Sequence, residues 1–258
     1  MERIDVKGTP AALALAAIGV VTAACAIRLG GPAPVEYRVL ALDAGERAVP
    51  EEVARRIRDA DANVVLLGAE GDTAWFAGAA RAADLTLSGP GIREGRGLAF
   101  LATEPLGDTT VALPIGDDPA GPSILVHDAL YEVDDDRFLD LLAVRLRPGQ
   151  DVDAAIQALL RYIATDVMQQ AAVALAVDVP DAGSAARAAH LLEPAFMDAR
   201  DCIPDAGEDG GEDDASSSSR APPGMLLFYG PELRMRCERA EQRREAGNPI
   251  VANLVVAR

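Results

Sequence analysis

Four charged side chains stand at the ends of apolar runs that have the length of buried strands. Three of them are the carboxylates of Asp43, Glu70 and Asp178, and the fourth is the guanidinium of Arg145. Carboxylates that converge at the ends of strands can hold a divalent cation, so these acids are candidate metal ligands. An arginine at such a place can bind an anion or a carboxylate through two parallel hydrogen bonds.

The elements that must position these residues alternate between strand and helix patterns. The predicted strands are residues 37–42, 64–67, 85–87, 97–103, 109–114, 123–133, 138–146, 172–177, 225–229, 233–238 and 250–256. The predicted helices are residues 51–60, 73–83, 153–167 and 184–192. Pro50 opens the first helix, and Ser184 is the predicted N-cap of the last. This order predicts an α/β (α+β) fold with two packed mixed β-sheets flanked by helices.

The composition allows a core but limits what fills it. Of the 258 residues, 50% are hydrophobic and only 4% are aromatic, so the core must be built from Ala, Val and Leu. Lys and Arg total 24 against 41 Asp and Glu, a formal charge of −17, and Lys7 is the single lysine. Such a surface repels phosphate backbones, so no strong nucleic-acid binding is expected. Three cysteines are too few for a disulfide scaffold or a four-thiolate zinc site.

Residues 8–27 form an uncharged, alanine-rich run that is long enough to span a bilayer as a helix. A single-pass anchor or uncleaved signal, a cleaved signal peptide, a lipid-modified Cys25 and a buried first helix are all open interpretations. The Gly- and Pro-rich residues 30–34 then break any helix. We therefore expect an N-terminal hydrophobic helix and linker over residues 1–35, a main domain over residues 36–258, and a protein that is membrane-anchored or exported.

Residues 201–223 combine clustered acids, glycines and serines with nothing to bury, which predicts a disordered acidic loop inside the main domain. Cys202 and Cys237 lie on the two sides of this loop. In an exported domain they could form a disulfide that closes the loop, whereas free thiols are expected in the cytoplasm.

The order of elements, with the residues they carry, resembles the endonuclease/exonuclease/phosphatase superfamily, whose members have the deoxyribonuclease-I-like fold. The resemblance covers about Tyr37 to Ala257. It rests on the segments YRVLALD (37–43), EEVARRIRDADANVVLLGAE (51–70), RGLAFLATEPL (96–106), FLDLLAVRL (138–146), VALAVDVP (173–180) and GNPIVANLVV (247–256). It implies a four-layer sandwich with a metal-dependent phosphodiesterase site at the ends of the strands.

In that superfamily a glutamate holds a divalent cation, usually magnesium, and an aspartate activates the attacking water. A histidine pair stabilises the charge on phosphorus, and asparagines orient the phosphate. In this sequence Asp43 replaces the asparagine of the opening strand. Ala69 stands at the position of the metal glutamate, with Glu70 one residue later, and Arg145 replaces the mid-chain histidine. Asp178 alone is retained in type and place.

The remaining positions of the family pattern have also changed. The final Ser-Asp-His motif falls on residues 245–247, which are Glu-Ala-Gly. The two histidines of the chain, His127 and His190, stand elsewhere and are predicted to have structural roles. Arg145 could hold an anion, or it could pair with Asp178 as a replacement for the metal charge, and we favour the pairing.

The resemblance therefore implies a catalytically degenerate domain, a pseudoenzyme that acts by binding or scaffolding at a membrane. Its expected partners are an unknown protein or a small anionic ligand, with the membrane contacted through residues 8–27, and no cofactor is expected. The alternative is an active Mg-dependent phosphodiesterase or phosphatase. In that enzyme Asp178 would be catalytic, Glu70 would bind the metal, and Arg145 and Asp43 would contact the substrate. A purely structural protein whose anchor is its functional part is a third interpretation.

Overall fold

The computed structural model describes residues 35–45, 48–93, 96–104, 107–116, 121–134, 137–167, 171–203, 224–230, 235–243 and 248–256. These residues all belong to one unit, Val35–Ala257. The apolar run 8–27, the linker 30–34 and most of the predicted acidic loop lie outside the described residues. Among the helices that are described, none is both long and apolar enough to cross a membrane.

The first sheet, sheet A, contains the first and the last described strands of the chain. Its strands are β1 (Val35–Asp43), β2 (Val64–Glu70), β3 (Thr86–Arg93), β4 (Arg96–Ala102), β11 (Met235–Gln242) and β12 (Ile250–Val256). Their order across the sheet is β11-β12-β1-β2-β4-β3. Strands β1 and β2 are parallel, and the other neighbours are antiparallel. The sheet is therefore mixed, as predicted.

The second sheet, sheet B, is built in the same way from the middle of the chain. Its strands are β5 (Gly107–Pro114), β6 (Ser123–Asp134), β7 (Arg137–Arg145), β8 (Ala171–Asp178), β9 (Met197–Asp198) and β10 (Met225–Tyr229). Their order is β5-β6-β7-β8-β10-β9. Only β7 and β8 are parallel. Each sheet thus has one parallel pair at its centre, and the carboxyl ends of these pairs carry the candidate residues.

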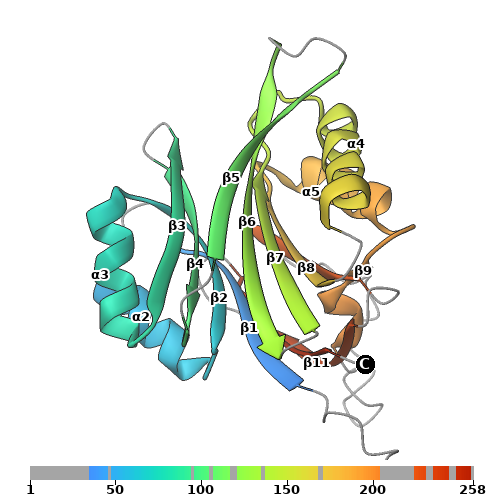
Figure 1. The fold of residues 1–258 in the computed structure, drawn as a ribbon. Coiled ribbons are helices and arrows are strands. Elements are labelled where there is room, and N and C mark those ends of the chain that lie inside the picture. The colour runs from blue at the N-terminus through green and yellow to red at the C-terminus, as the bar shows by residue number, and fades with distance from the viewer. Residues whose placement is uncertain are drawn as a thin grey trace, which may run out of the picture. The chain divides into compact units, whose positions relative to one another are not determined.

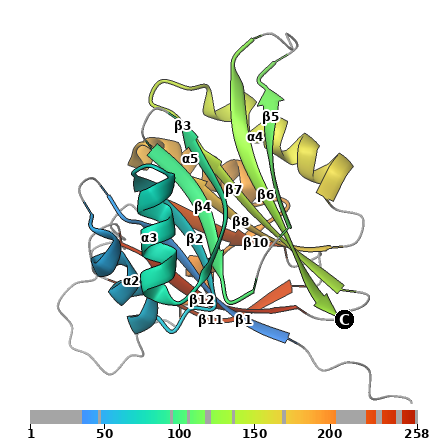
Figure 2. The ribbon, with the colours of Figure 1, turned by 60° about the vertical axis from the view of Figure 1, so that its left-hand side comes forward.

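Helices cover the outer face of each sheet. The pair α2 (Pro50–Asp59) and α3 (Thr73–Ala83) packs on sheet A, where Ile57 and Phe76 join a buried cluster with Leu67. The pair α4 (Val152–Tyr162) and α5 (Ala182–Leu192) packs on sheet B, on the far side of the sandwich (Figure 1). Figure 2 shows α3 in front of sheet A with α2 beside it. The order helix, sheet, sheet, helix confirms the predicted four-layer fold.

The core between the sheets is rich in small side chains. Ala41 and Ala252 of sheet A face Ala174 and Ala176 of sheet B within one buried cluster. The four largest fully buried side chains are nevertheless aromatic: Phe76, Phe100, Phe196 and Phe228. The few aromatic residues are therefore concentrated where packing needs bulk, and Ala, Val and Leu supply most of the remaining core.

Several local predictions need correction. The N-cap of α5 is Asp181 and not Ser184, because the Asp181 carboxylate accepts hydrogen bonds from the Ser184 N–H at 2.9 Å and the Ser184 hydroxyl at 2.8 Å. The predicted helix 153–167 ends as an α-helix at Tyr162 and continues as the π-helix η1 (Ile163–Val167). Asp201 and Cys202 belong to the short 3-10 helix η2 (Ala199–Cys202), so the first residues of the predicted loop are ordered.

Candidate functional site

The candidate residues gather where the parallel strand pairs of both sheets end. In sheet A, Asp43 of β1 is paired with Gly68 of β2. In sheet B, Arg145 of β7 is paired with Asp178 of β8. Paired residues of parallel strands project to the same face of a sheet. The topology therefore brings residues that are far apart in the sequence to one end of the sandwich.

Arg145 and Asp178, both of sheet B, form an ion pair on the face of that sheet that is turned toward sheet A. The Nε–H of Arg145 donates a hydrogen bond to Oδ2 of Asp178, and the side chains are 20% and 5% exposed, respectively. Nη2 of Arg145 donates a further hydrogen bond of 3.1 Å to the carbonyl oxygen of Gly97, on β4 of sheet A. The pairing that the sequence favours is therefore present. Its anchor on Gly97, which sequence reasoning missed, ties sheet B to sheet A.

Asp178 is held on its backbone as well as through its side chain. Its carbonyl oxygen accepts a hydrogen bond of 2.9 Å from the N–H of Leu146, and the N–H of Val179 donates to Gly224 O at 3.3 Å. Gly68 lies opposite, because a Cβ built on it would be 3.9 Å from Oδ2 of Asp178. The carboxylate is thus enclosed by β2, β7 and the start of β10, and it is largely shielded from water.

Asp43 lies at the end of β1 and contacts the segment that leads into β10. Its Oδ1 accepts a hydrogen bond of 3.1 Å from the N–H of Gly45, which closes a local turn. Gly224 approaches so closely that a Cβ on it would be 2.6 Å from Oδ2 of Asp43. A glycine is therefore required here for space. Only the structure shows this contact, since Gly224 precedes an apolar strand and looks like an ordinary turn residue in the sequence.

The two faces of β2 separate Glu70 from the position that the family pattern assigns to the metal glutamate. Ala69 is fully buried among the residues that pack under α2 and α3. Gly68, its neighbour, faces the other sheet near Met225 and Asp178. Because side chains alternate along a strand, Glu70 projects to the same face as Gly68, where it is exposed. Glu70, and not Ala69, therefore lies on the face of β2 that is turned toward sheet B.

The resemblance found in the sequence implies a divalent cation, but these residues do not suit one. Within the described part of the chain, no three His, Cys, Asp or Glu side chains come together in a group that could hold a metal ion. Asp43, Glu70 and Asp178 therefore do not form a three-carboxylate centre. The guanidinium of Arg145 already supplies a positive charge against Asp178. A second cation at the same carboxylate would be repelled by that charge.

His127 lies on the inner face of sheet B, near the ion pair. It is 2% exposed, and its Nδ1 shares a hydrogen bond of 3.0 Å with the hydroxyl of Thr110 on the neighbouring strand. Burial, and then the positive charge of Arg145, lower the pKa of His127, while Asp108 opposes this shift. Burial and the guanidinium thus both favour the neutral imidazole. This geometry agrees with the predicted structural role, and His190 is exposed on α5.

A second pair of acids lies on the outer face of sheet B, below the end of α4. The hydroxyl of Tyr162 donates a hydrogen bond of 2.6 Å to Oδ2 of Asp128. Asp140 is 7% exposed, and burial followed by the charge of Asp128 raises its pKa to about 7. Burial also raises the pKa of Asp128, although the bond from Tyr162 opposes this shift. The sequence analysis did not single out this pair, although each acid interrupts an otherwise apolar strand.

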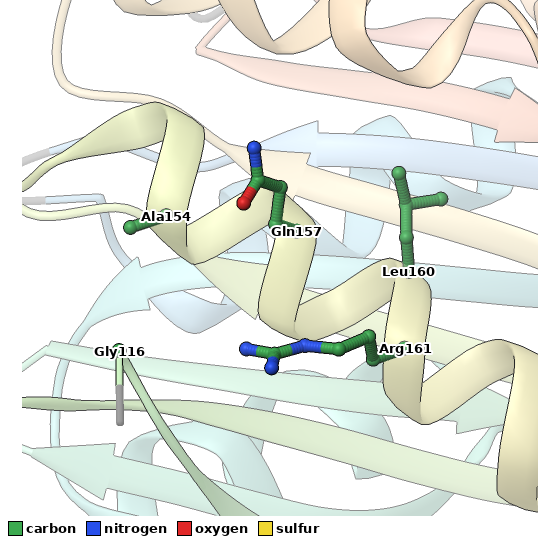
Figure 3. A pocket seen from close by; sticks show the side chains of 5 residues that line it. All are labelled: Gly116, Ala154, Gln157, Leu160 and Arg161. Atoms are coloured by element: carbon green, nitrogen blue, oxygen red, sulfur yellow. The ribbon is translucent and has the colours of Figure 1, made fainter. Parts of the chain in front are cut away.

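A hollow of about 360 Å³ also lies on the outer side of sheet B, beside α4. It is lined by Gly116, Ala154, Gln157, Leu160 and Arg161. Figure 3 shows the side chain of Arg161 extending from the helix toward the side where Gly116 lies. The ion pair of Arg145 faces the opposite way, toward sheet A. The hollow is therefore separate from the candidate site.

The structure consists of two mixed sheets that pack face to face between helices, with polar residues at the ends of the central parallel strands. This arrangement is the deoxyribonuclease-I-like fold of the endonuclease/exonuclease/phosphatase superfamily. Solved structures support this conclusion directly. A family protein from Bacteroides thetaiotaomicron superposes with a TM-score of 0.60 and 11% identity over 88% of this chain and 100% of that chain. A family protein from Bacteroides vulgatus superposes with a TM-score of 0.59 and 15% identity over 85% and 98% of the two chains.

A mannosyl-6-phosphatase from Bacteroides thetaiotaomicron has a TM-score of 0.57 and 11% identity, over 85% of this chain and 99% of that chain. No family model matches the sequence, and no curated protein matches it in a sequence comparison. At these identities the likeness concerns the fold. The deoxyribonuclease-I-like fold that the sequence resemblance implies is therefore confirmed.

Proposed function

We propose that this domain is a non-hydrolytic member of its fold class, which binds a ligand or partner at the end of the sandwich where Arg145 and Asp178 lie. The observation that carries the proposal is the contact between Arg145 and Asp178. A water-activating aspartate must have a lone pair directed at the attacking water. Here the Asp178 carboxylate is 5% exposed and accepts a hydrogen bond from the guanidinium instead.

The ion pair also takes the place of a catalytic cation. In a metal-dependent hydrolase the cation polarises the phosphate and stabilises the charge that develops in the transition state. A guanidinium fixed between Asp178 and Gly97 supplies charge but does not lower the pKa of a bound water. When several residues act together in catalysis, the enzyme loses most of its rate if one of them is removed. Several changes at once therefore argue against hydrolysis.

Arg145 retains donors that could receive a ligand. Nε and Nη2 are engaged by Asp178 and Gly97, whereas Nη1 has no hydrogen-bond partner among the described residues. The side chain is 20% exposed, so a small anion could reach it from solvent. A carboxylate or phosphate oxygen is the chemistry that a guanidinium edge recognises. We therefore assign a small anionic group, free or on a protein partner, as the ligand.

The proposal includes attachment to a membrane through residues 8–27. The absence of charge over this run supports it. The full chain, synthesised in the presence of phosphatidylcholine vesicles, should float with them and resist alkaline extraction. A chain carrying Leu15→Arg and Val20→Arg should stay in the soluble fraction. Equal behaviour of the two chains would refute the anchor.

Hydrolysis is tested on the full chain with magnesium. We expect no heat of binding when MgCl2 is titrated in a calorimeter, and no magnesium-dependent cleavage of bis(p-nitrophenyl) phosphate or p-nitrophenyl phosphate. The Asp178→Ala variant serves as the matched control. Turnover in the natural sequence that requires magnesium and is lost in Asp178→Ala would establish the alternative, an active phosphodiesterase or phosphatase.

Anion binding is tested separately with inorganic phosphate. The full chain should bind phosphate weakly, and Arg145→Met should abolish the binding. Arg187→Met is the matched control, because Arg187 also pairs with an aspartate, Asp153, but does so on the exposed surface of α4 and α5. Phosphate binding that is unchanged in Arg145→Met would refute the assignment.

A further inference from the structure

Two cysteines, one in helix η2 and one on strand β11, lie together at the edge of the sandwich. Cys202 ends helix η2, which follows strand β9 of sheet B, and Cys237 lies on β11, the edge strand of sheet A. Both side chains are half-buried. The thiol of Cys237 hydrogen-bonds with that of Cys202, and Sγ of Cys202 is 3.4 Å from the hydroxyl of Tyr229. The fold thus holds the two thiols together while both remain reduced.

We propose that Cys202 and Cys237 form a disulfide that fastens sheet A to sheet B when the protein meets a low-molecular-weight disulfide. The bond would enclose residues 203–236 in a covalent loop. This loop contains β10 and Gly224, the residue that lies against Asp43 in the candidate site. Oxidation would therefore also restrain β10 and Gly224, and through Gly224 it would affect the position of Asp43 in the candidate site. The inference rests on the thiols alone and is independent of the proposed function.

The chemistry is a pair of thiol–disulfide exchanges. Cys202 loses its proton, and its thiolate attacks one sulfur of the reagent, whose S–S bond breaks and releases a first reagent thiol after protonation. Cys237 then loses its proton and attacks Sγ of Cys202, so that the mixed disulfide breaks and a second reagent thiol leaves. Two protein thiols are oxidised and one reagent disulfide is reduced. No other co-reactant is required.

The order of the two steps follows from the surroundings of the thiols. Burial is the first cause that raises the pKa of Cys237, and the neighbouring Cys202 adds to the shift. Cys237 is therefore a poor first nucleophile, because the thiolate is the reactive form. Once Cys202 carries the mixed disulfide, Cys237 is already beside its sulfur. The second step should be the slower one and should accelerate as the pH rises.

The test uses the full chain treated with bis(2-hydroxyethyl) disulfide. Of the three thiols in the sequence, only Cys25 should still react with Ellman's reagent, and mass spectrometry should find the peptides of Cys202 and Cys237 linked. Because the bond restricts the unfolded chain, oxidation should raise the melting temperature by on the order of 10 °C. Cys25→Ser should keep this shift, and Cys237→Ser should lose it.

Three results would overturn the inference. They are two persistent mixed disulfides with the reagent, a crosslink that involves Cys25, and an internal bond that leaves the melting temperature unchanged. If Cys237→Ser fails to fold, the oxidised and reduced forms of the natural sequence supply the comparison, and reduction with dithiothreitol should reverse the shift.

Discussion

Arg145 and Asp178 occupy paired positions of the parallel strands β7 and β8, and their side chains meet on the face of sheet B that is turned toward sheet A. The contact follows from the register of the two parallel strands, because side chains at paired positions project in the same direction. The guanidinium also reaches the carbonyl of Gly97 in the opposite sheet. The pair therefore has both a structural role and a place in the candidate site.

Removing the guanidinium should be costly. Arg145→Met would leave a carboxylate that is 5% exposed without its ion pair, and we expect a loss of roughly 3–5 kcal/mol in the free energy of unfolding. Urea unfolding followed by the fluorescence of Trp75, the single tryptophan, measures it. Adding Asp178→Leu to Arg145→Met should recover part of the loss. A single variant as stable as the natural protein would contradict the buried pair.

The two glycines of the site should respond differently to alanine. At Gly224 the added Cβ would be 2.6 Å from Oδ2 and 2.8 Å from Cβ of Asp43, so Gly224→Ala should cost about 1–3 kcal/mol. At Gly68 the nearest atom, at 2.9 Å, is the flexible end of Met225, which can move aside. Gly68→Ala is therefore the matched control and should cost less. Equal urea midpoints for the two variants would argue against the close approach of Asp43.

The buried Asp140 should make stability depend on pH. Its pKa is about 7 in the fold, against the ordinary 3.8 of an aspartate, because burial and then the charge of Asp128 disfavour its ionised form. Its contribution to stability is full below about pH 4, falls as the pH rises and is lost above about pH 7. Asp140→Asn should therefore stabilise the protein at pH 8 by on the order of 2 kcal/mol relative to its effect at pH 5. Urea unfolding at the two pH values measures the difference, and an effect of the same size at both would refute the assignment.

The proximity of His127 to Arg145 can be measured by NMR. The pKa of His127 is lowered by burial and by the guanidinium, so its ring protons should titrate below the usual range for histidine. Arg145→Met removes one of the two causes and should move the midpoint upward. The signal of His190, which is exposed on α5, is the internal control. A midpoint of His127 that does not respond to Arg145→Met would place the two side chains too far apart to interact.

The strands and their layers could be predicted because the apolar runs are strong signals. Residues 225–229 and 250–256 were predicted with the bounds that the structure gives. Strand β3 was harder, because its Gly-Pro-Gly run, residues 89–91, looks like a break. It lies instead in an edge strand with a register shift, where proline is tolerated. The N-cap of α5 was misplaced because Asp181 supplies two acceptor oxygens three residues before Ser184.

The candidate site was only partly accessible from the sequence. The pairing of Arg145 with Asp178 could be predicted, because the resemblance places both residues in one site, where an arginine can replace the charge of the metal. The orientation of Glu70 could not, since one residue of register decides which face of β2 a side chain takes. The contact between Gly224 and Asp43 joins two sheets and leaves no local pattern. Contacts of this kind depend on how layers pack, which periodicity does not encode.

The position of β12 has a consequence for synthesis of the chain. This strand, Ile250–Val256, lies between β1 and β11, so the first described strand obtains its antiparallel neighbour from the last. While a ribosome is still translating the preceding residues, β1 has one open edge that exposes unpaired backbone amides and carbonyls. Sheet A can close only after Val256 has left the exit tunnel. Ribosome-bound chains that stop short of Ile250 should accordingly depend on chaperones to avoid association through that edge.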